Sequence, residues 1–335
     1  MKCQITLLSL ALIGGAVQAK ADSVPFGVAS AYNLVALGVS GSSTLTGNIS
    51  TSADVGGRVA AADMVTAGTT IGSTLNTDPF GSLATNDVVS TNGFNSGEQF
   101  NVNSHGNVFA PGTNGNINFN GGGHRVTTGG SGVDFAALRT SLDAESLALG
   151  NLAPTGTNLG TGNSQYGNPS FYVLLGTDPN LNVFTISAAV FGSANDPLDI
   201  VAPAGSTVII NVQGSAAQLN TGIYYNGTQY AGDSSATDDI LFNFADASSV
   251  AIDGQFSASL LAPFANLTGD AQMDGNFIAG QIGQTGEVHN VEFDGTLPSF
   301  TSATPEPDSL LLAGTGLMGL AAFVRRRRSR VAQRS

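Results

Sequence analysis

The side chains best suited to chemistry in this sequence are three histidines and a few grouped carboxylates. His105, His124 and His289 lie far apart along the chain, and none has a second histidine at the spacing of a helical metal site. On a strand, Glu287 and His289 would share one face, whereas Glu292 would point to the other. The group therefore favours a structural role near the end of the domain over a zinc site.

Two adjacent acids are candidates for glycoside hydrolysis, which needs two facing carboxyl groups. Asp238 and Asp239 would point to opposite faces of a strand, so a solvated turn is the favoured interpretation. Polysaccharide lyases on β-helices commonly use Arg or Lys, and residues 22–304 hold only Arg58, Arg125 and Arg139. No Ser-His-Asp spacing stands out. We predict no catalytic residue and no enzymatic activity, with a polysaccharide-acting enzyme on a β-helix as an alternative.

Two kinds of loop could bind small ligands. Residues 121–123 are glycines, but the lysine and hydroxyl residue of a phosphate-binding loop are missing. The acids Asp196, Asp199, Asp233 and Asp238 lack the alternating spacing and closing Glu of a calcium loop. We therefore expect no cofactor and no metal site, and calcium is left as an open alternative.

Charge restricts the partners of this chain. Between residues 22 and 304 the chain keeps three of its 11 basic residues and 22 of its 24 acidic ones, a net charge of −19. Phosphate binding needs clustered Lys and Arg, so nucleic acid is excluded as a natural partner and anionic membrane surfaces are disfavoured. The single cysteine, Cys3, lies outside this part, so packing and backbone hydrogen bonds must supply its stability.

The elements that must position these side chains are short strands and one helix. Glycine occupies 44 of 335 positions, which indicates many turns. Alternating apolar residues predict strands at 171–175, 183–191, 198–201 and 207–212. The fold of residues 73–130 is left open.

One segment has helical periodicity. Phe135, Leu138, Leu142 and Leu149 recur at steps of three, four and seven residues, and Asp134 suits the helix start. The pattern predicts a helix at 133–149 whose apolar stripe needs a surface to lie on.

A repeat indicates the fold class. Residues 252–258 recur as 273–279, an offset of 21, and residues 55–61 have the same shape. Short strands with glycine corners, such as Gly254 and Gly275, and a period near 20 indicate coils of a β-solenoid. A β-sandwich is the rival. The predicted class is mainly β: a β-solenoid (β-helix) with one flanking α-helix near 133–149 and a short C-terminal hydrophobic helix.

Both ends of the chain carry export-type patterns. A basic start, an apolar core at 5–17 and small residues around Ala19 predict a signal peptide at 1–21. The apolar run at 310–324 is shorter than the roughly 20 residues of a comfortable membrane span, so we expect transient inner-membrane anchoring. The predicted sorting signal comprises Pro305, Glu306, Pro307, Arg325, Arg326, Arg327 and Arg328.

This tail resembles the PEP-CTERM sorting signal of Gram-negative bacteria, in which a Pro-Glu-Pro triplet precedes a hydrophobic helix and a basic end. The resemblance implies an exosortase-type processing enzyme as partner and delivery to the cell surface or extracellular polymer. Residues 26–295 are similar to the choice-of-anchor A domain, most specifically Leu-Leu-Ala-Pro at 260–263 and Gly-Glu-Val-His-Asn at 286–290. That resemblance implies an adhesive role and a β-helical body, and carries over no site residue.

We therefore expect a signal peptide at 1–21, a β-solenoid domain at 22–298 and a sorting tail at 299–335. Residues 22–304, which lie between the two export-type patterns, are called the exported part below. The expected function is that of an exported cell-surface or extracellular-matrix protein, an adhesin or structural component associated with the extracellular polysaccharide of a biofilm. Binding to ice or another ordered solid is an alternative that needs a regular rank of threonines. Thr66, Thr69 and Thr70 cluster, but no repeating ladder of threonines is visible. The ligand and the oligomeric state stay open.

Overall fold

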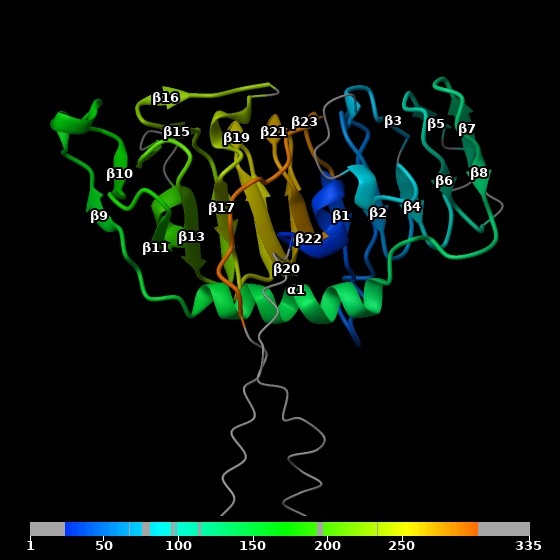
Figure 1. The fold of residues 1–335 in the computed structure, drawn as a ribbon, viewed down its shortest axis with the longest axis horizontal. Helices are drawn as coiled ribbons and strands as arrows, with labels where there is room; N and C mark the ends of the chain where they lie inside the picture. The colour runs from blue at the N-terminus through cyan, green and yellow to red at the C-terminus, as the bar shows by residue number, and fades with distance from the viewer. Residues whose placement is uncertain are drawn as a thin grey trace, which may run out of the picture. The chain divides into compact units, whose positions relative to one another are not determined.

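The computed structural model describes residues 24–66, 68–75, 81–94, 97, 99–112, 115–192, 197–232 and 234–300 (Figure 1). The chain divides into two units, residues 1–297 and 298–335, and the helices and strands named below belong to the first. The predicted signal peptide, the apolar run at 310–324 and the seven sorting residues lie outside the described residues. Among the described helices, none is both long and apolar enough to cross a membrane.

The first unit consists mainly of short strands paired in parallel, with successive strands stacked as coils. One ladder, here called the helix face, runs in the order β11 (Leu181–Ser187), β13 (Thr207–Gln213), β17 (Ile240–Asn243), β20 (Ser259–Gly269), β22 (Phe277–Ile282), β1 (Leu34–Ala36), β2 (Val59–Ala61), β4 (Val88–Ser90), β6 (Val108–Phe109) and β8 (Arg125–Val126).

A second ladder, here called the open face, joins β14 (Ala216–Leu219), β18 (Ser249–Ile252) and the C-terminal halves of β20 and β22. Isolated bridges at Ile49, Val65 and Phe94 continue it along the stack. The strand β20 bends from the helix face to the open face where its register shifts, between Ala262 and Asn266.

The third face is made of three shorter sheets. Their parallel strands are β10 (Tyr172–Leu175), β12 (Leu198–Val201), β15 (Ile223–Tyr225), β19 (Phe256–Ser257), β21 (Met273–Asp274), β23 (Val288–His289), β3 (Thr70–Ile71), β5 (Gln99–Val102) and β7 (Asn116–Phe119). Two antiparallel strands are added at the edges, β9 (Thr157–Gly160) on β10 and β16 (Thr228–Gln229) on β15. The 3₁₀ helices are η1 (Gly27–Ala31), η3 (Gly81–Leu83), η4 (Ser164–Tyr166), η5 (Ala188–Gly192) and η6 (Ser235–Thr237).

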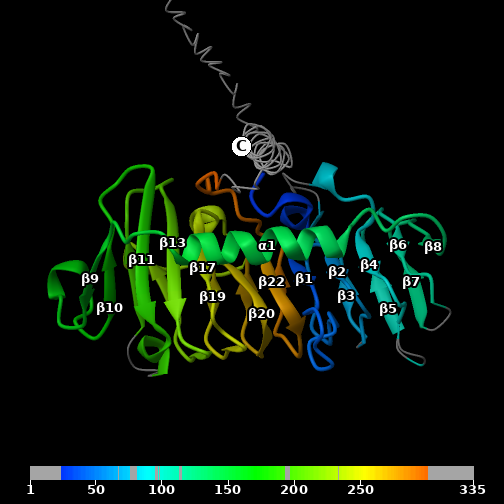
Figure 2. The same ribbon diagram turned by 90° about the horizontal axis from the view of Figure 1, so that it is seen from below.

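Spatial order and chain order differ at the middle of the stack. There β22, from the end of the unit, pairs in parallel with β1, from its beginning. The chain thus enters in the middle and runs outward to β8. The helix α1 (Phe135–Gly150) then carries it back along the stack, and the later coils return from the other end to the middle (Figures 1 and 2).

The helix α1 forms close to its predicted bounds. The Asp134 side chain accepts hydrogen bonds from the backbone N–H groups of Ala136 and Ala137, at 3.1 Å each, which caps the first turn. Leu138, Leu142 and Leu149 are buried, so the predicted apolar stripe has its surface. That surface is formed by the outward side chains of the helix face: Val35, Ala60, Val89, Phe109, Val183, Ile209, Leu241, Leu261 and Ile278.

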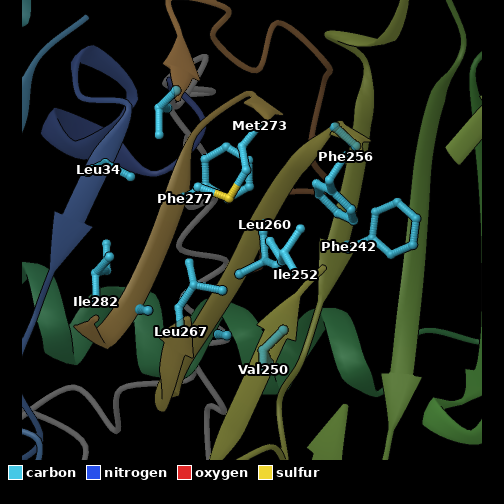
Figure 3. Close-up of a cluster of buried hydrophobic side chains, with 14 of the residues drawn as sticks. Leu34, Phe242, Val250, Ile252, Phe256, Leu260, Leu267, Met273, Phe277 and Ile282 are labelled. Atoms are coloured by element: carbon cyan, nitrogen blue, oxygen red, sulfur yellow. The ribbon is translucent and has the colours of Figure 1, made fainter. Parts of the chain in front are cut away.

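Inward side chains from all three faces form one continuous core (Figure 3). Both hydrophobic clusters draw their members from Phe26 to Leu297, so residues 24–300 contain the complete described core and should fold without the signal and tail. Central core residues include Leu34, Phe242, Val250, Ile252, Phe256, Leu260, Leu267, Met273, Phe277 and Ile282.

The stacking register corrects the predicted 21-residue repeat. Met273 lies beside Phe256 and Phe277 beside Leu260, a step of 17 residues, whereas Ile252 lies beside Gly269. The sequence match gave the wrong stacking partner because an apolar residue followed by Asp and Gly can form the corner between any two faces. Here Ile252 ends a strand of the open face and Met273 begins one of the third face.

Two other expectations are resolved. The strand predicted at 183–191 ends at Ser187 and continues as the 3₁₀ helix η5. The region left open, 73–130, contributes β4, β5, β6, β7 and β8, so its described part forms coils of the same stack.

Candidate binding face

The histidines singled out in the sequence are not brought together. His105 and His124 are exposed, in the coils near β7 and β8, while His289 ends β23 near the middle of the stack. Among the described residues, no group of three or more His, Cys, Asp or Glu side chains could hold a metal ion.

His289 belongs to a chain of polar contacts on the third face. Its Nδ1 shares a hydrogen bond with Asp274 Oδ1, and its Nε2 lies 3.8 Å from Glu287 Oε1. Ser257 Oγ donates to the other oxygen of Asp274 at 2.5 Å. The carboxylate lies between serine and histidine, so this histidine is not placed to take the proton of the serine, as a Ser-His-Asp triad requires.

The segment after β16 lies over this polar chain. The backbone carbonyl of Tyr230 accepts hydrogen bonds from Ser257 Oγ at 2.7 Å and from Gln255 Nε2 at 3.0 Å. Asp274 is 2% exposed as a result. A buried carboxylate with two partners supports the structural role expected for this region.

The adjacent acids Asp238 and Asp239 lie in the turn between η6 and β17, close to Asp294. Burial, and then the negative charges of Asp239 and Asp294, raise the pKa of Asp238 to about 6. The backbone N–H of Asp294 donates to the Asp238 carbonyl at 3.0 Å, which links this turn to the end of the unit. The turn that we expected here is confirmed, but its acids are not simply solvated.

All three arginines between residues 22 and 304 make polar contacts within the fold. Arg58 Nε lies 2.6 Å from Asp87 Oδ1 across neighbouring coils. Arg125 Nε donates to the carbonyl of Ala110 at 2.9 Å, and Arg139 Nη1 reaches the carbonyl of Leu37 at 3.3 Å. These contacts account for the arginines without a substrate.

The acid-rich loops are described in part. Asp199 is buried, and its Oδ1 accepts a hydrogen bond from the N–H of Gly227 at 3.0 Å. Burial raises the pKa of Asp199, and that hydrogen bond acts against the rise. Asp196 and Asp233 lie outside the described residues.

The open face carries two ranks of outward side chains that the sequence analysis missed. Their inward neighbours, such as Val250, Leu267 and Ile282, are buried, so alternation along each strand turns the flanking residues outward. The first rank is Ala216, Ser249, Asn266, Gln281, Asn48 and Met64. The second is Gln218, Ala251, Thr268, Gly283, Ser50 and Thr66.

Neither rank contains an ionisable residue, and every member is exposed or partly exposed. With coils about 4.8 Å apart and alternate residues about 7 Å apart, the two ranks form a grid roughly 24 Å long. Acids stand beside this grid, at the corner to the third face, where Asp253 follows β18 and Asp270 follows β20. In a chain this acidic, a charge-free face stands out from the rest of the surface.

The other two faces differ from it. The helix face is covered by α1, and the third face carries the acids Asp54 and Glu287 at outward positions. The threonine cluster also divides. Thr66 is on the open face and Thr70 on the third face, while Thr69 donates to the carbonyl of Ala53. These three threonines do not form one rank.

A signal for the open face exists in the sequence. Large apolar residues alternate with small or polar ones at 249–252, 266–268 and 281–283, and the outward positions lack charge in each segment. The signal was hidden because the segments align only at the 17-residue and 15-residue steps that the backbone pairing sets, between Val250, Leu267 and Ile282.

Comparison with known proteins adds two matches. A family described as "Putative Ice-binding-like adhesive domain" matches residues 25–290, and a PEP-CTERM protein-sorting motif matches residues 303–328. No curated protein matches the chain. The predicted sorting signal is confirmed as a motif. The roles of its single residues and the resemblance to choice-of-anchor A stay predictions.

Proposed function

Since the chain belongs to the ice-binding-like adhesive domain family, we propose that it is a non-enzymatic surface protein whose open face adheres to neutral extracellular polysaccharide. The sorting motif supports export, transient residence in the inner membrane and processing by an exosortase-type enzyme. Delivery to the cell surface or extracellular matrix is part of the proposal.

The parallel ladders support the interpretation of the fold as a β-solenoid. Coils stacked in register give flat faces whose side chains repeat along one axis. A flat face that presents uncharged side chains at regular intervals suits a ligand that is itself long and repetitive. An enzyme would instead need a cleft with convergent groups.

The observation that carries the proposal is the charge-free character of the open face. The net charge of −19 on the exported part would repel an anionic polymer, whereas a neutral polymer meets hydroxyl and amide groups without the cost of desolvating a charge. Ala251 and Gly283 leave room for a chain to approach the backbone between the longer polar side chains.

Affinity would come from many weak contacts made together. Each exposed hydrogen bond contributes little, since water competes for both partners. A polymer that spans several coils adds these contacts at high effective concentration, so the combined affinity exceeds that of any single contact.

The same regularity would suit an ordered solid such as ice, which is a second candidate. In the second rank, Thr268 and Thr66 are separated by Gly283 and Ser50, so threonines do not follow one another. The mixed side chains favour a flexible polymer over a rigid lattice.

The test uses residues 24–300, which contain the complete described core. The protein is incubated with the extracellular polysaccharide of its own host, with and without calcium, while released sugar ends are assayed. Binding without release supports the proposal. Release of new sugar ends would establish an enzyme, and inhibition of ice recrystallisation without polymer binding would establish the second candidate.

A further inference from the structure

The two ends of the coil stack differ in how their strand edges are treated. At the β11 end, the backbone N–H groups of Thr155 and Gly156 donate to the carbonyl of Val183 at 2.9 and 3.0 Å. Thr155 Oγ1 accepts from the N–H of Val183 at 2.9 Å, and β9 pairs with β10 beside it. Gly156 packs so closely on the ring of Phe184 that a Cβ would lie 2.1 Å from it. This end is capped.

The opposite end is uncapped among the described residues. There β7 pairs with β5 alone and β8 with β6 alone, and no described element lies beyond them (Figure 1). Ile117 and Phe119 face the core but stay partly exposed, whereas Phe100 and Val102, one coil inward, are buried. The backbone groups of this edge and the core side chains beside it have no further described coil to pair with or pack against.

The edge also lacks the usual protection against pairing. Exposed edge strands normally carry charged side chains, proline or bulges. The sequence of β7 is Asn-Ile-Asn-Phe, with neither charge nor proline. The arginine of β8, Arg125, bends back to the carbonyl of Ala110. The four-residue edge of β7 is short, but with neither charge nor proline it can still pair with another strand.

Charge also favours this end as a contact between copies. Residues 99–133 contain no Asp and no Glu, although the exported part carries 22 acids. Two copies that met at any strongly acidic surface would repel each other. The coils built from residues 99–133 can therefore meet a second copy without bringing acids of their own sequence together, a property that residues 146–177 at the capped end share.

Hydrogen bonds between the asparagine side chains of neighbouring coils also support a contact at this end. Asn118 Nδ2 donates to Asn101 Oδ1 at 3.0 Å, and Asn120 Nδ2 donates to Asn103 Oδ1 at 2.8 Å. The outermost amides use a donor toward the inner coil and keep their carbonyl oxygens. Those oxygens can accept from a further amide placed where the next coil would be.

We propose that two copies of this chain associate end to end through the edges of β7 and β8. A partner must present two strand edges at the same separation and a matching uncovered core, and an identical end does both. A two-fold axis perpendicular to the stack sets the edges antiparallel. Since the β11 end is capped, the assembly closes as a dimer and does not grow into a fibre.

Cross-linking of residues 24–300, which lack Cys3, tests the contact. Asn116 is exposed on β7, and the exported part has no cysteine, so Asn116→Cys places one thiol at the proposed interface. Ser170→Cys, exposed near the capped end, is the matched control. A short bis-maleimide should give a dimer band for Asn116→Cys and not for Ser170→Cys or the parent chain. No band, or equal bands for both variants, would overturn the proposal.

Sedimentation of residues 24–300 gives a second measure. The parent should be a dimer at micromolar concentration, and Asn116→Glu should weaken dimerisation by about tenfold or more, because association would bring the added charge into the covered edge of β7. Ser141→Glu, on the exposed side of α1, adds the same charge elsewhere and should leave the dimer intact. Circular dichroism verifies that each variant is folded. A folded parent that stays monomeric, or oligomers larger than a dimer, would contradict the proposed contact.

Discussion

Asn276 donates its side-chain amide to the backbone carbonyl of Tyr32 at 2.8 Å, although 244 residues separate the two along the chain. The same amide reaches the carbonyl of Ser30 at 3.1 Å, and its oxygen accepts from the N–H of Phe293 at 2.6 Å. From the other side, Asn33 Nδ2 donates to the carbonyls of three late residues, Gly275, His289 and Val291. The two asparagines join the first and last parts of the unit.

Asn276→Ala should therefore weaken the whole unit. The change leaves two buried carbonyls and one buried N–H without these hydrogen bonds, so we expect a loss of about 2–4 kcal/mol in the free energy of unfolding. Urea denaturation followed by circular dichroism measures it. Asn158→Ala removes an exposed side-chain hydrogen bond to the Thr185 carbonyl and should lower the free energy of unfolding by less than about 1 kcal/mol. Equal losses in the two variants would show that the hydrogen bonds between the first and last parts of the unit do not add more stability than an exposed one.

The packing of α1 on the helix face gives a second prediction. Leu142 is 1% exposed against the helix face, and Leu147 on the same helix is 47% exposed. Leu142→Ala should lower the free energy of unfolding by about 2–4 kcal/mol, because it leaves a cavity. Leu147→Ala should change it by less than about 0.5 kcal/mol. If both variants unfold at the denaturant concentration of the parent, α1 does not hold the face as described.

Protonation of Glu145 gives a third prediction. Burial raises the pKa of Glu145 from 4.5 to about 7, so the folded protein holds this proton more tightly than the unfolded chain. Its contribution to stability is complete below the unfolded pKa and is lost as pH rises through about 7. Asp238, with a pKa of about 6, acts in the same direction. The melting temperature should therefore rise between about pH 8 and about pH 5.

Glu145→Gln should reduce that pH-dependent rise by about 2–4 °C, since the amide carries no proton to lose. Asp270→Asn removes an exposed carboxylate and serves as the control. Melting curves of the three proteins across this pH range give the comparison. A rise that Glu145→Gln leaves unchanged would show that this carboxyl does not bind its proton on folding.

The elements of this fold were easier to predict than their stacking. The spacing of Leu138, Leu142 and Leu149 determined the helix within two residues, because an amphipathic pattern is local. The partner of a coil is not local, and the 21-residue repeat aligned Met273 with Ile252 instead of Phe256. The pairing of β22 with β1 could not be predicted either, since no sequence pattern links Leu34 with Phe277, which lies 243 positions later.

The candidate site shows the same limit. His289 and Asp238 stood out in the sequence because their side chains are reactive. In the structure, His289 belongs to a chain of structural polar contacts and Asp238 lies close to two other acids. The open face consists of ordinary residues such as Ser249 and Thr268, and it emerges only when separate strands are placed in register. A site defined by the absence of charge has no motif to find.

Salt should have little effect on adhesion if the open face makes the contact. Neutral partners have no ionic contact to screen, so the dissociation constant should change less than about twofold between about 50 and about 500 mM NaCl. Co-sedimentation with the polymer at several salt concentrations measures this. A loss of affinity of about tenfold or more would assign binding to charged groups, such as the corner acids Asp253 and Asp270.

The central claim is that the charge-free ranks of the open face bind the neutral polymer, and paired substitutions test it most directly. Ala251→Glu puts one charge into the second rank, and Ala144→Glu puts the same charge on the exposed side of α1. We predict that Ala251→Glu weakens co-sedimentation with the polysaccharide by about tenfold or more while Ala144→Glu matches the parent. Equal binding by all three folded proteins would contradict the account.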